Sequence, residues 1–183
     1  MRRYWFPKPY ADRVAKLRVV GGFIMVAAFL WFSAPTLESL AVGLPVALIG
    51  VAFRAWAAGH LEKNMQLATG GPYRFVRNPL YIGTLTTAAG FAIASRRWEL
   101  GLLFAVVFIA VYLPVIELEE QHLRKLFPNY TTYADRVPML LPRIPPIEST
   151  RRFRWAIYRK NEEFQAGLGF LAGVGLLVWK VFR

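Results

Sequence analysis

The sequence predicts an all-α integral membrane protein with about five transmembrane helices. Three observations support this class. Hydrophobic residues make up 56% of the 183 residues and the mean hydropathy is +0.34, whereas soluble domains contain roughly 45–50% apolar residues. These residues are concentrated in runs that are long enough to cross a bilayer. Cysteine is absent and histidine occurs twice, which excludes a disulfide scaffold and a histidine-rich metal site.

The apolar runs define the spans in order along the chain. A helix needs about 20 residues to cross the hydrocarbon, at a rise of about 1.5 Å per residue. Each run approaches this length, and the third is the shortest because two arginines close it. The predicted spans are residues 17–32, 37–58, 80–94, 100–116 and 164–182.

The charge distribution predicts how these spans are oriented. The formal net charge is +12, from 23 basic and 11 acidic residues. Basic residues are concentrated in segments 2–18, 54–77 and 124–160, which share one side of the membrane if the spans alternate. Cytoplasmic loops carry an excess of Lys and Arg, so we expect a cytoplasmic N-terminus, at the inner membrane if the source is bacterial. Because the basic residues flank apolar spans, anionic lipids are the expected partners and nucleic acid is not.

Segment 69–83 combines turn-forming residues, arginines and tyrosines at the start of the third span. Gly70 and Gly71 allow positive φ and a close approach of a ligand. Pro79 suits the first turn of a helix, which makes Asn78 the N-cap. The free N–H groups at such a helix start suit a carboxylate. The segment is therefore either a ligand site or a membrane-entry turn with Tyr73 and Tyr81 as interface anchors.

Segment 117–124 continues the fourth span without a break, so we expect this helix to project beyond the membrane. At 3.6 residues per turn, Glu117, Glu120 and Arg124 share one face and Glu119 lies on a neighbouring face. In so basic a chain, three carboxylates beside the membrane are expected to have partners. Three arrangements are open: pairing with arginines of another segment, binding of a cationic ligand, or a solvated face with a Glu120–Arg124 pair.

Arg54 and Arg77 are the candidate partners of these carboxylates. Arg54 lies about one turn inside the end of the second span, where an ionisable residue is a candidate for function, although it can also extend to the interface. His60 follows this span. It either lines a site or sits wet at the interface.

Three motifs occur in a fixed order along the chain. The run 71–83 reads GPYRFVRNPLYIG, and 37 residues separate its second tyrosine from the pair Glu119-Glu120. A tail follows, with Phe127-Pro-Asn-Tyr-Thr-Thr-Tyr and then Val-Pro at 137–138. Together they resemble the isoprenylcysteine carboxyl methyltransferase and phospholipid methyltransferase superfamily. Its pattern is an Arg-His-Pro-x-Tyr element, a hairpin of two spans, a Glu-Glu pair, and a Phe-Gly-x-x-Tyr-x-x-Tyr and Val-Pro ending.

The resemblance covers residues 52–143 and has two departures. Asn78 stands where many members have His, so acid–base chemistry is not expected at that position. Pro128 replaces a usual Gly in the tail turn.

The resemblance implies that S-adenosylmethionine binds in a cytoplasmic pocket closed by the segment after the fourth helix. It also implies a lipophilic acceptor that enters from the bilayer, either a phospholipid amine or a prenylcysteine-like carboxylate. Arg54 or Arg77 would position a carboxylate, and Glu117 or Glu62 would accept a proton from an amine. No metal is expected. The residues expected to hold the cofactor are His60, Gly71, Tyr73, Asn78, Pro79, Tyr81, Glu119, Glu120 and Tyr130.

Two other functions stay open at this point. Sterol and steroid reductases, which use NADPH, carry a similar Arg-His-x-x-Tyr element, but they have Asn before the Tyr where this chain has Leu80. The other alternative is a lipid-binding membrane protein without catalysis. In either case the same membrane fold would be retained.

The predicted organisation has two parts. Residues 1–144 form the membrane methyltransferase domain, with the motif-bearing core at 52–143. Residues 145–183 form a basic interfacial helix and an additional span. Gly169 and Gly173 in this span have the spacing that allows close helix packing, which would suit a homodimer.

Overall fold

The structure is a computed structural model that describes residues 5–144, 148 and 151–183. Within these ranges every regular element is helical, which confirms the predicted all-α class. The predicted boundary at 144/145 adjoins residues 145–147, which lie outside the described residues. The helices are α1 (Lys8–Phe32), α2 (Leu37–Ala58), the 3₁₀ turn η1 (Gly71–Arg74), α3 (Pro79–Ser95), α4 (Trp98–Val107), the π-helical turn η2 (Phe108–Tyr112), α5 (Leu113–Leu126), α6 (Tyr130–Arg136), α7 (Trp155–Lys160) and α8 (Phe164–Phe182).

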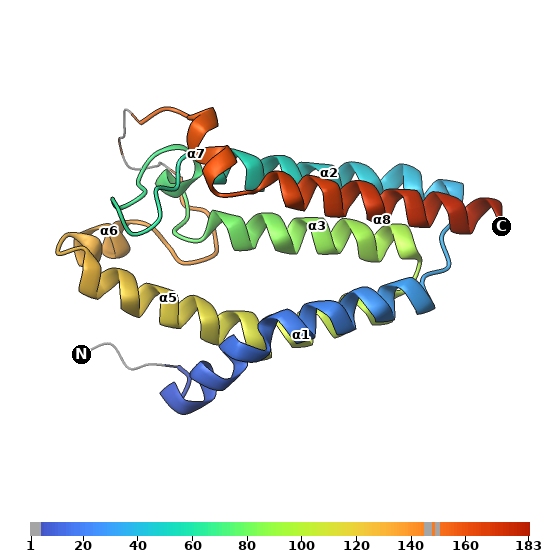
Figure 1. The fold of residues 1–183 in the computed structure, drawn as a ribbon, viewed down its shortest axis with the longest axis horizontal. Helices are drawn as coiled ribbons and strands as arrows, with labels where there is room; N and C mark the ends of the chain where they lie inside the picture. The colour runs from blue at the N-terminus through green and yellow to red at the C-terminus, as the bar shows by residue number, and fades with distance from the viewer. Residues whose placement is uncertain (1–4, 145–147, 149–150) are drawn as a thin grey trace.

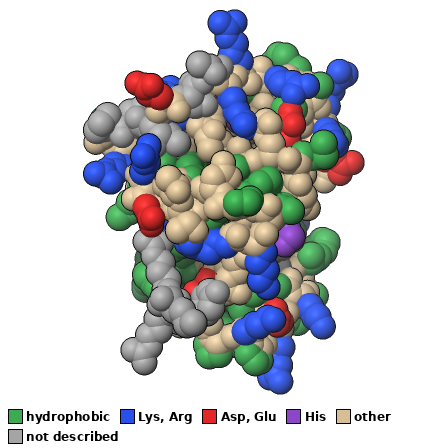
Figure 2. All heavy atoms as spheres, turned by 90° about the vertical axis from the view of Figure 1, so that its left-hand side faces the viewer, with side chains coloured by type: hydrophobic (Ala, Val, Ile, Leu, Met, Phe, Trp, Pro, Cys, Tyr) green, Lys and Arg blue, Asp and Glu red, His purple; other side chains and the backbone are tan. Residues whose placement is uncertain are grey.

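The long helices run between two ends of the molecule (Figure 1). One end collects the start of α1, the connection from α2 to α3, and the segments around α6 and α7. The other end holds the turns after α1 and α3 and the end of α8. Lys and Arg side chains are spread over the face of the first end (Figure 2). The three basic segments therefore do share one end, as their alternation with the spans predicts.

Three helices are long and apolar enough to cross a membrane: α2, the continuous Trp98–Leu126 and α8. The two segments of α1, Lys8–Leu17 and Val19–Phe32, add a fourth span if the pair, bent by 53°, is counted as one. α3 has 17 residues, fewer than the roughly 20 that cross the hydrocarbon unaided. It lies alongside α2, so the five predicted helices are present and three or four of them meet the criteria for a span.

Small residues let α2 and α3 approach until their backbones touch. A Cβ placed on Gly43 would lie 2.4 Å from the backbone N of Ala94. One on Gly90 would lie 2.2 Å from the backbone N of Ala47. In lipid no hydrophobic force holds helices together, so close packing of small residues supplies the attraction. This contact makes α2 and α3 the rigid pair on which the rest of the site is built.

Gly169 and Gly173 in α8, which have the spacing predicted for close helix packing, differ in their surroundings. Gly173 packs against the ring of Phe91 on α3, and a Cβ there would lie 2.8 Å from that ring. Among the residues that the structure describes, no atom outside the helix lies within 4 Å of the Cβ position at Gly169. One half of the motif thus serves packing within the chain.

Tyr10 ties the start of α1 to the helix that carries the acidic segment. Pro114 has no N–H and cannot donate to the carbonyl of Ala110, four residues before it. The hydroxyl of Tyr10 donates to that oxygen at 2.6 Å. Trp98–Leu126 therefore continues through the proline as one 29-residue segment, which confirms that segment 117–124 extends the fourth span.

Candidate functional site

The tail after α5 folds back onto the turn that precedes α3. The Tyr133 hydroxyl on α6 donates to the carbonyl of Tyr73 at 2.8 Å. The Arg77 backbone N–H donates to Pro138 O at 2.9 Å. Further on, the Arg143 N–H donates to Phe75 O at 3.0 Å. These contacts bring the three motifs of the sequence together at one end of the molecule.

Arg77 and Glu120 form a buried, two-point ion pair at the centre of this end. Arg77 Nε donates to Glu120 Oε1 at 2.8 Å and Nη2 donates to Oε2 at 3.0 Å. Arg77 Nη1 donates to the carbonyls of Ala134 and Val137 at 2.7 and 2.8 Å. A guanidinium has five N–H donors, so these contacts occupy four of them. We call this arrangement the Arg77 clamp, because it fixes α5, α3 and the tail to one another.

Asn78 stands at the N-cap position of α3, but its side chain makes no capping hydrogen bond. Its Nδ2 donates to Glu120 Oε1 at 3.2 Å and to Met139 O at 3.3 Å. The amide therefore belongs to the clamp. Asn78 therefore occupies the predicted N-cap position, but its side chain does not cap the helix. A cap needs the amide oxygen to accept a backbone N–H of the first turn, whereas the contacts of Nδ2 with Glu120 and Met139 orient this amide.

The Glu120–Arg124 pair within α5 is not formed. Glu120 turns to Arg77, 43 residues away, because burial of that carboxylate demands a fixed partner. The Arg124 guanidinium instead lies over the ring of Tyr130, 5.2 Å from its centre. This is the range of a cation–π contact.

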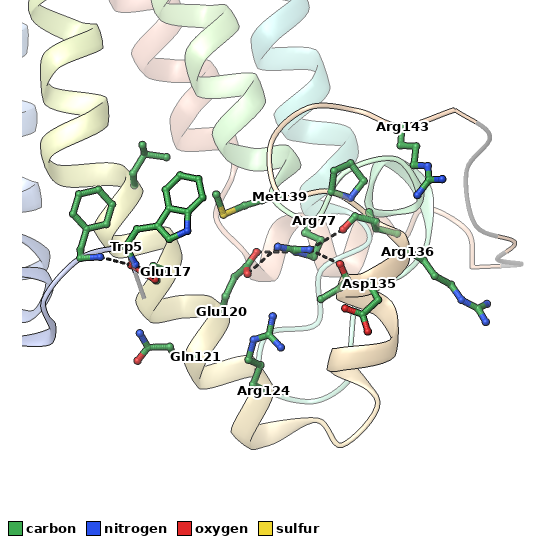
Figure 3. Close-up of a pocket in the computed structure, with 15 residues that line it drawn as sticks. Trp5, Arg77, Glu117, Glu120, Gln121, Arg124, Asp135, Arg136, Met139 and Arg143 are labelled. Atoms are coloured by element: carbon green, nitrogen blue, oxygen red, sulfur yellow. Dashed lines mark hydrogen bonds and ion pairs between the residues drawn. The ribbon is translucent and has the colours of Figure 1, made fainter. Parts of the chain in front are cut away.

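A cavity of about 580 Å³ lies on one side of the clamp, between α5, the tail and the start of the chain (Figure 3). We call it the small cavity. Glu117 on its wall accepts the backbone N–H groups of Trp5 and Phe6 at 2.9 and 3.1 Å. The predicted proton acceptor thus holds the N-terminal arm, and Trp5 stands beside it in the cavity wall.

A second and larger cavity, of about 930 Å³, also adjoins the clamp, and we call it the large cavity. Arg77 lines both cavities. Residues Ala15, Val19 and Gly22 of α1 supply an apolar wall. The site residues predicted from the sequence that line the large cavity are Arg54, Tyr73, Arg77, Tyr81, Glu119 and Tyr130.

Two tyrosines that line the large cavity, Tyr73 and Tyr130, have hydroxyl groups that are buried away from water. Burial raises the pKa of the Tyr73 hydroxyl, and the nearby carboxylates of Glu163 and Glu119 raise it further. Burial likewise raises the pKa of Tyr130. Its buried hydroxyl has no hydrogen-bond partner in the part of the chain that the structure describes. An unpaired buried hydroxyl costs stability.

Arg54 crosses from α2 to the wall of the large cavity. Its Nε contacts Glu163 Oε1 at 2.5 Å, and its Nη1 donates to Leu80 O at 3.3 Å and to the hydroxyl of Thr84. Glu119 accepts from the hydroxyl of Tyr81 at 3.1 Å. The predicted pairing of Arg77 with a carboxylate of segment 117–124 is formed. Arg54 instead pairs with Glu163, which lies outside that segment.

Four predicted cofactor residues lie outside the lining of both cavities: His60, Gly71, Asn78 and Pro79. His60 is buried, and its Nδ1 lies 2.9 Å from Trp56 O. Gly71 has a φ of +54°, and a Cβ there would lie 2.6 Å from the His60 ring. The His60 ring packs against Gly71 and thereby supports the turn η1. Pro79 is the first residue of α3.

Glu163 is the site residue that sequence reasoning missed. It precedes α8 and lines the large cavity although it lies far beyond the three motifs. The one available signal was an acidic residue immediately before an apolar span, on the same side as Arg54. Among the described residues, no group of three or more His, Cys, Asp or Glu side chains could hold a metal ion.

Comparison with known proteins agrees with this geometry. Residues 17–130 match the family described as phospholipid methyltransferase. The chain is 32% identical over 97 residues to protein-S-isoprenylcysteine O-methyltransferase of Schizosaccharomyces pombe, covering 52% of this chain and 41% of that protein. No solved structure matches the chain.

Two bacterial relatives share a longer stretch. The nickel-cobalt-cadmium resistance protein of Alcaligenes xylosoxydans xylosoxydans is 30% identical over 142 residues, or 72% of this chain and 65% of that protein. The cobalt-zinc-cadmium resistance protein of Cupriavidus metallidurans is also 30% identical over 142 residues. The chain spans less than two thirds of the length of each, at 65% and 64%. With more than half of its residues matched by the family and the motifs assembled around one clamp, the chain belongs to the phospholipid methyltransferase family.

Proposed function

We propose that the protein is an S-adenosylmethionine-dependent membrane methyltransferase that acts on an amphiphilic acceptor entering from the bilayer. The observation that carries the proposal is the large cavity. It joins the motif residues Tyr73, Tyr81 and Glu119 to an apolar wall formed by α1. A cavity with a polar end and a lipid-like wall suits a polar cofactor and an acceptor with an apolar tail.

The residues of the large cavity fit the cofactor. Its volume of about 930 Å³ lies within the range of roughly 300–1,000 Å³ typical of ligand sites. Glu119 and the Tyr81 hydroxyl would bind the ammonium or ribose hydroxyl groups of S-adenosylmethionine. Tyr73 and Tyr130 would contact its adenine or its sulfonium. The cofactor supplies a methyl group that its sulfonium already activates.

The protein then has to align the acceptor and exclude water, which lowers the barrier of a displacement that needs little further activation. Arg54 would hold an anionic group of the acceptor, because it lines the cavity. Arg77 acts as a positioning residue, since its donors are occupied by Glu120 and the tail. Glu117 is also a positioning residue, because its carboxylate holds the backbone of Trp5 and Phe6 in the N-terminal arm.

The end of the molecule that carries both cavities would face the cytoplasm. Its basic segments are the feature that favours this orientation. A cytoplasmic site also has access to S-adenosylmethionine.

Calorimetry on the detergent-purified protein tests this function. S-adenosylhomocysteine should bind with micromolar affinity, and NADPH should not. Glu119→Gln should weaken the binding of S-adenosylhomocysteine about tenfold, because a charged hydrogen bond is lost. Glu162→Gln is the matched control, since Glu162 is exposed and lines neither cavity.

Methyl transfer completes the test. Radiolabel from the methyl group of S-adenosylmethionine should enter the lipid fraction of membranes that contain the protein. NADPH binding in place of S-adenosylhomocysteine would move the function to a reductase. Binding of neither compound would leave a fold without this activity.

A further inference from the structure

The segment after residue 150 contributes a side chain to the large cavity, although the family match ends at residue 130. That side chain is Glu163, which is 10% exposed and contacts Arg54 Nε at 2.5 Å. The two residues are 109 positions apart. The C-terminal segment is thus a wall of the site as well as a membrane helix.

Asn161 holds this segment on the end of α2, the helix that carries Arg54. Its Nδ2 donates to the carbonyls of Ala58 and Leu61 at 2.9 and 2.8 Å. The last carbonyls of a helix have no partner within it, so they are available to a side-chain donor. Because the segment is fixed here, the carboxylate of Glu163, two residues further on, has a fixed place beside Arg54.

The Arg54 side chain is directed across α3 at Gly83. A Cβ on Gly83 would meet Arg54 Cγ and would lie 2.8 Å from Gly50 O, so a side chain there would displace the arginine or part the two helices. Beyond this crossing, Arg54 Nη1 donates to Leu80 O at 3.3 Å and to the hydroxyl of Thr84. These contacts with α3 fix one end of the guanidinium.

Glu163 fixes the other end. A guanidinium is planar and has five N–H donors. Nη1 uses two of them on Leu80 and Thr84, and Nε uses one on Glu163. With both nitrogens bound, the plane of the group is set. No residue of the described ranges bonds to Nη2, so its two N–H groups remain for a ligand in the cavity that Arg54 lines.

No other carboxylate of the cavity wall holds Arg54 in this way within the part of the chain that the structure describes. Glu62 and Glu119 accept hydrogen bonds from other side chains. An arginine near the end of a membrane helix can extend its long side chain to the interface, and Arg54 is 25% exposed. The contact of Nε with Glu163 keeps the side chain turned toward the cavity.

We propose that Glu163 is a positioning residue, which orients Arg54 so that Nη2 binds the anionic group of the methyl acceptor. The inference rests on the proposed function, in which Arg54 holds that group. The role depends on the length of the Glu163 side chain and on its acceptor oxygen. Its negative charge works in the opposite direction, because it repels an anion. The two effects differ in sign, so substitutions can separate them.

Equilibrium binding of two amphiphiles tests this role. The probes are decyl phosphate and decanol, which share one alkyl chain and differ in the anionic group. Calorimetry in detergent, corrected by titrations without protein, gives the ratio of their affinities, which we call the anion preference. The wild-type protein should prefer decyl phosphate about tenfold, and Arg54→Gln should reduce the preference to about onefold, because a charged hydrogen bond is lost.

Three variants of Glu163 separate geometry from charge. Glu163→Gln keeps the length and an acceptor oxygen, so the anion preference should stay at the wild-type value or rise. Glu163→Asp keeps the charge but is one methylene shorter, and Glu163→Ala has no acceptor. Both should lower the preference about tenfold. A merely structural role would weaken both probes alike and leave the ratio unchanged. Glu162→Gln is the exposed control and should behave as the wild type.

An anion preference in Glu163→Ala at or above the wild-type value would overturn the role, because Glu163 would then act through its charge alone or not at all. A wild-type protein without an anion preference, or an Arg54→Gln variant that keeps one, would overturn it as well. Failure of the proposed function would look different. In that case S-adenosylhomocysteine would not bind and no methyl label would enter lipid, while the anion preference, measured without the cofactor, would still respond to the Glu163 variants.

Discussion

The Arg77 clamp and the Arg54–Glu163 pair join the same two chemical groups in two different ways. In the clamp both side chains are almost fully buried, with exposed fractions of 7% and 11%, and the carboxylate is met at two points. In the second pair Arg54 is 25% exposed and is met at one point. The clamp uses four guanidinium donors of Arg77 on protein atoms. In the second pair, no residue of the described ranges bonds to Nη2 of Arg54.

This difference assigns the two pairs to different tasks. A fully satisfied, buried pair orders the elements around it and has little capacity left for a ligand. A partly satisfied pair on a cavity wall can bind one. Four variants, in decreasing order of their effect on stability, test the contrast.

Glu120→Gln should cause the largest loss. It leaves the buried guanidinium of Arg77 without a counter-charge, and the removal of one member of a buried pair costs about 3–5 kcal/mol. The free energy of unfolding, measured by denaturation in detergent micelles, should fall by this amount. A loss similar to that of an exposed pair would remove the distinction between the clamp and the Arg54–Glu163 pair.

Tyr133→Phe should have the next effect, because it removes the hydroxyl that ties α6 to the turn below the clamp. The Tyr73 carbonyl then loses a donor at 2.8 Å, and an unsatisfied buried acceptor costs about 1–3 kcal/mol. Tyr130→Phe is the matched control, because its hydroxyl has no partner among the described residues. It should leave the free energy of unfolding unchanged or raise it. Equal losses in both variants would contradict this reasoning.

Glu163→Gln should cost on the order of 1 kcal/mol, since Arg54 is partly exposed and keeps its contacts with Leu80 and Thr84. The same denaturation experiment measures it. A loss as large as that of Glu120→Gln would show that this pair is also structural.

Arg154→Gln should have the smallest effect. Arg154 is 63% exposed where it meets Glu62, and surface pairs contribute about 0–1 kcal/mol. The difference from wild type should shrink further at high salt, because exposed charges are screened. A loss of several kcal/mol that salt does not change would place this pair with the clamp.

Much of the fold could be predicted from the sequence because membrane helices are encoded locally. The predicted spans 37–58 and 164–182 coincide with α2 and α8. The extension of the fourth span and the gathering of basic segments at one end were also correct. The prediction that the Asn78 side chain caps α3 was wrong. Whether this amide caps the helix or contacts a buried carboxylate depends on residues far along the chain, which the local sequence does not reveal.

The helical class, the location of the spans and the motifs of the family follow from the order of residues alone. Apolar runs and short motifs suffice for these, since each depends on neighbours in the chain. The pairing of Glu120 with Arg77 and of Arg54 with Glu163, across 43 and 109 residues, follows from the packing of the helices. Such partners depend on how each helix is rotated and how closely it approaches the next. Small residues set the approach of α2 to α3, and the docking of residues 153–163 on the end of α2 places Glu163 beside Arg54.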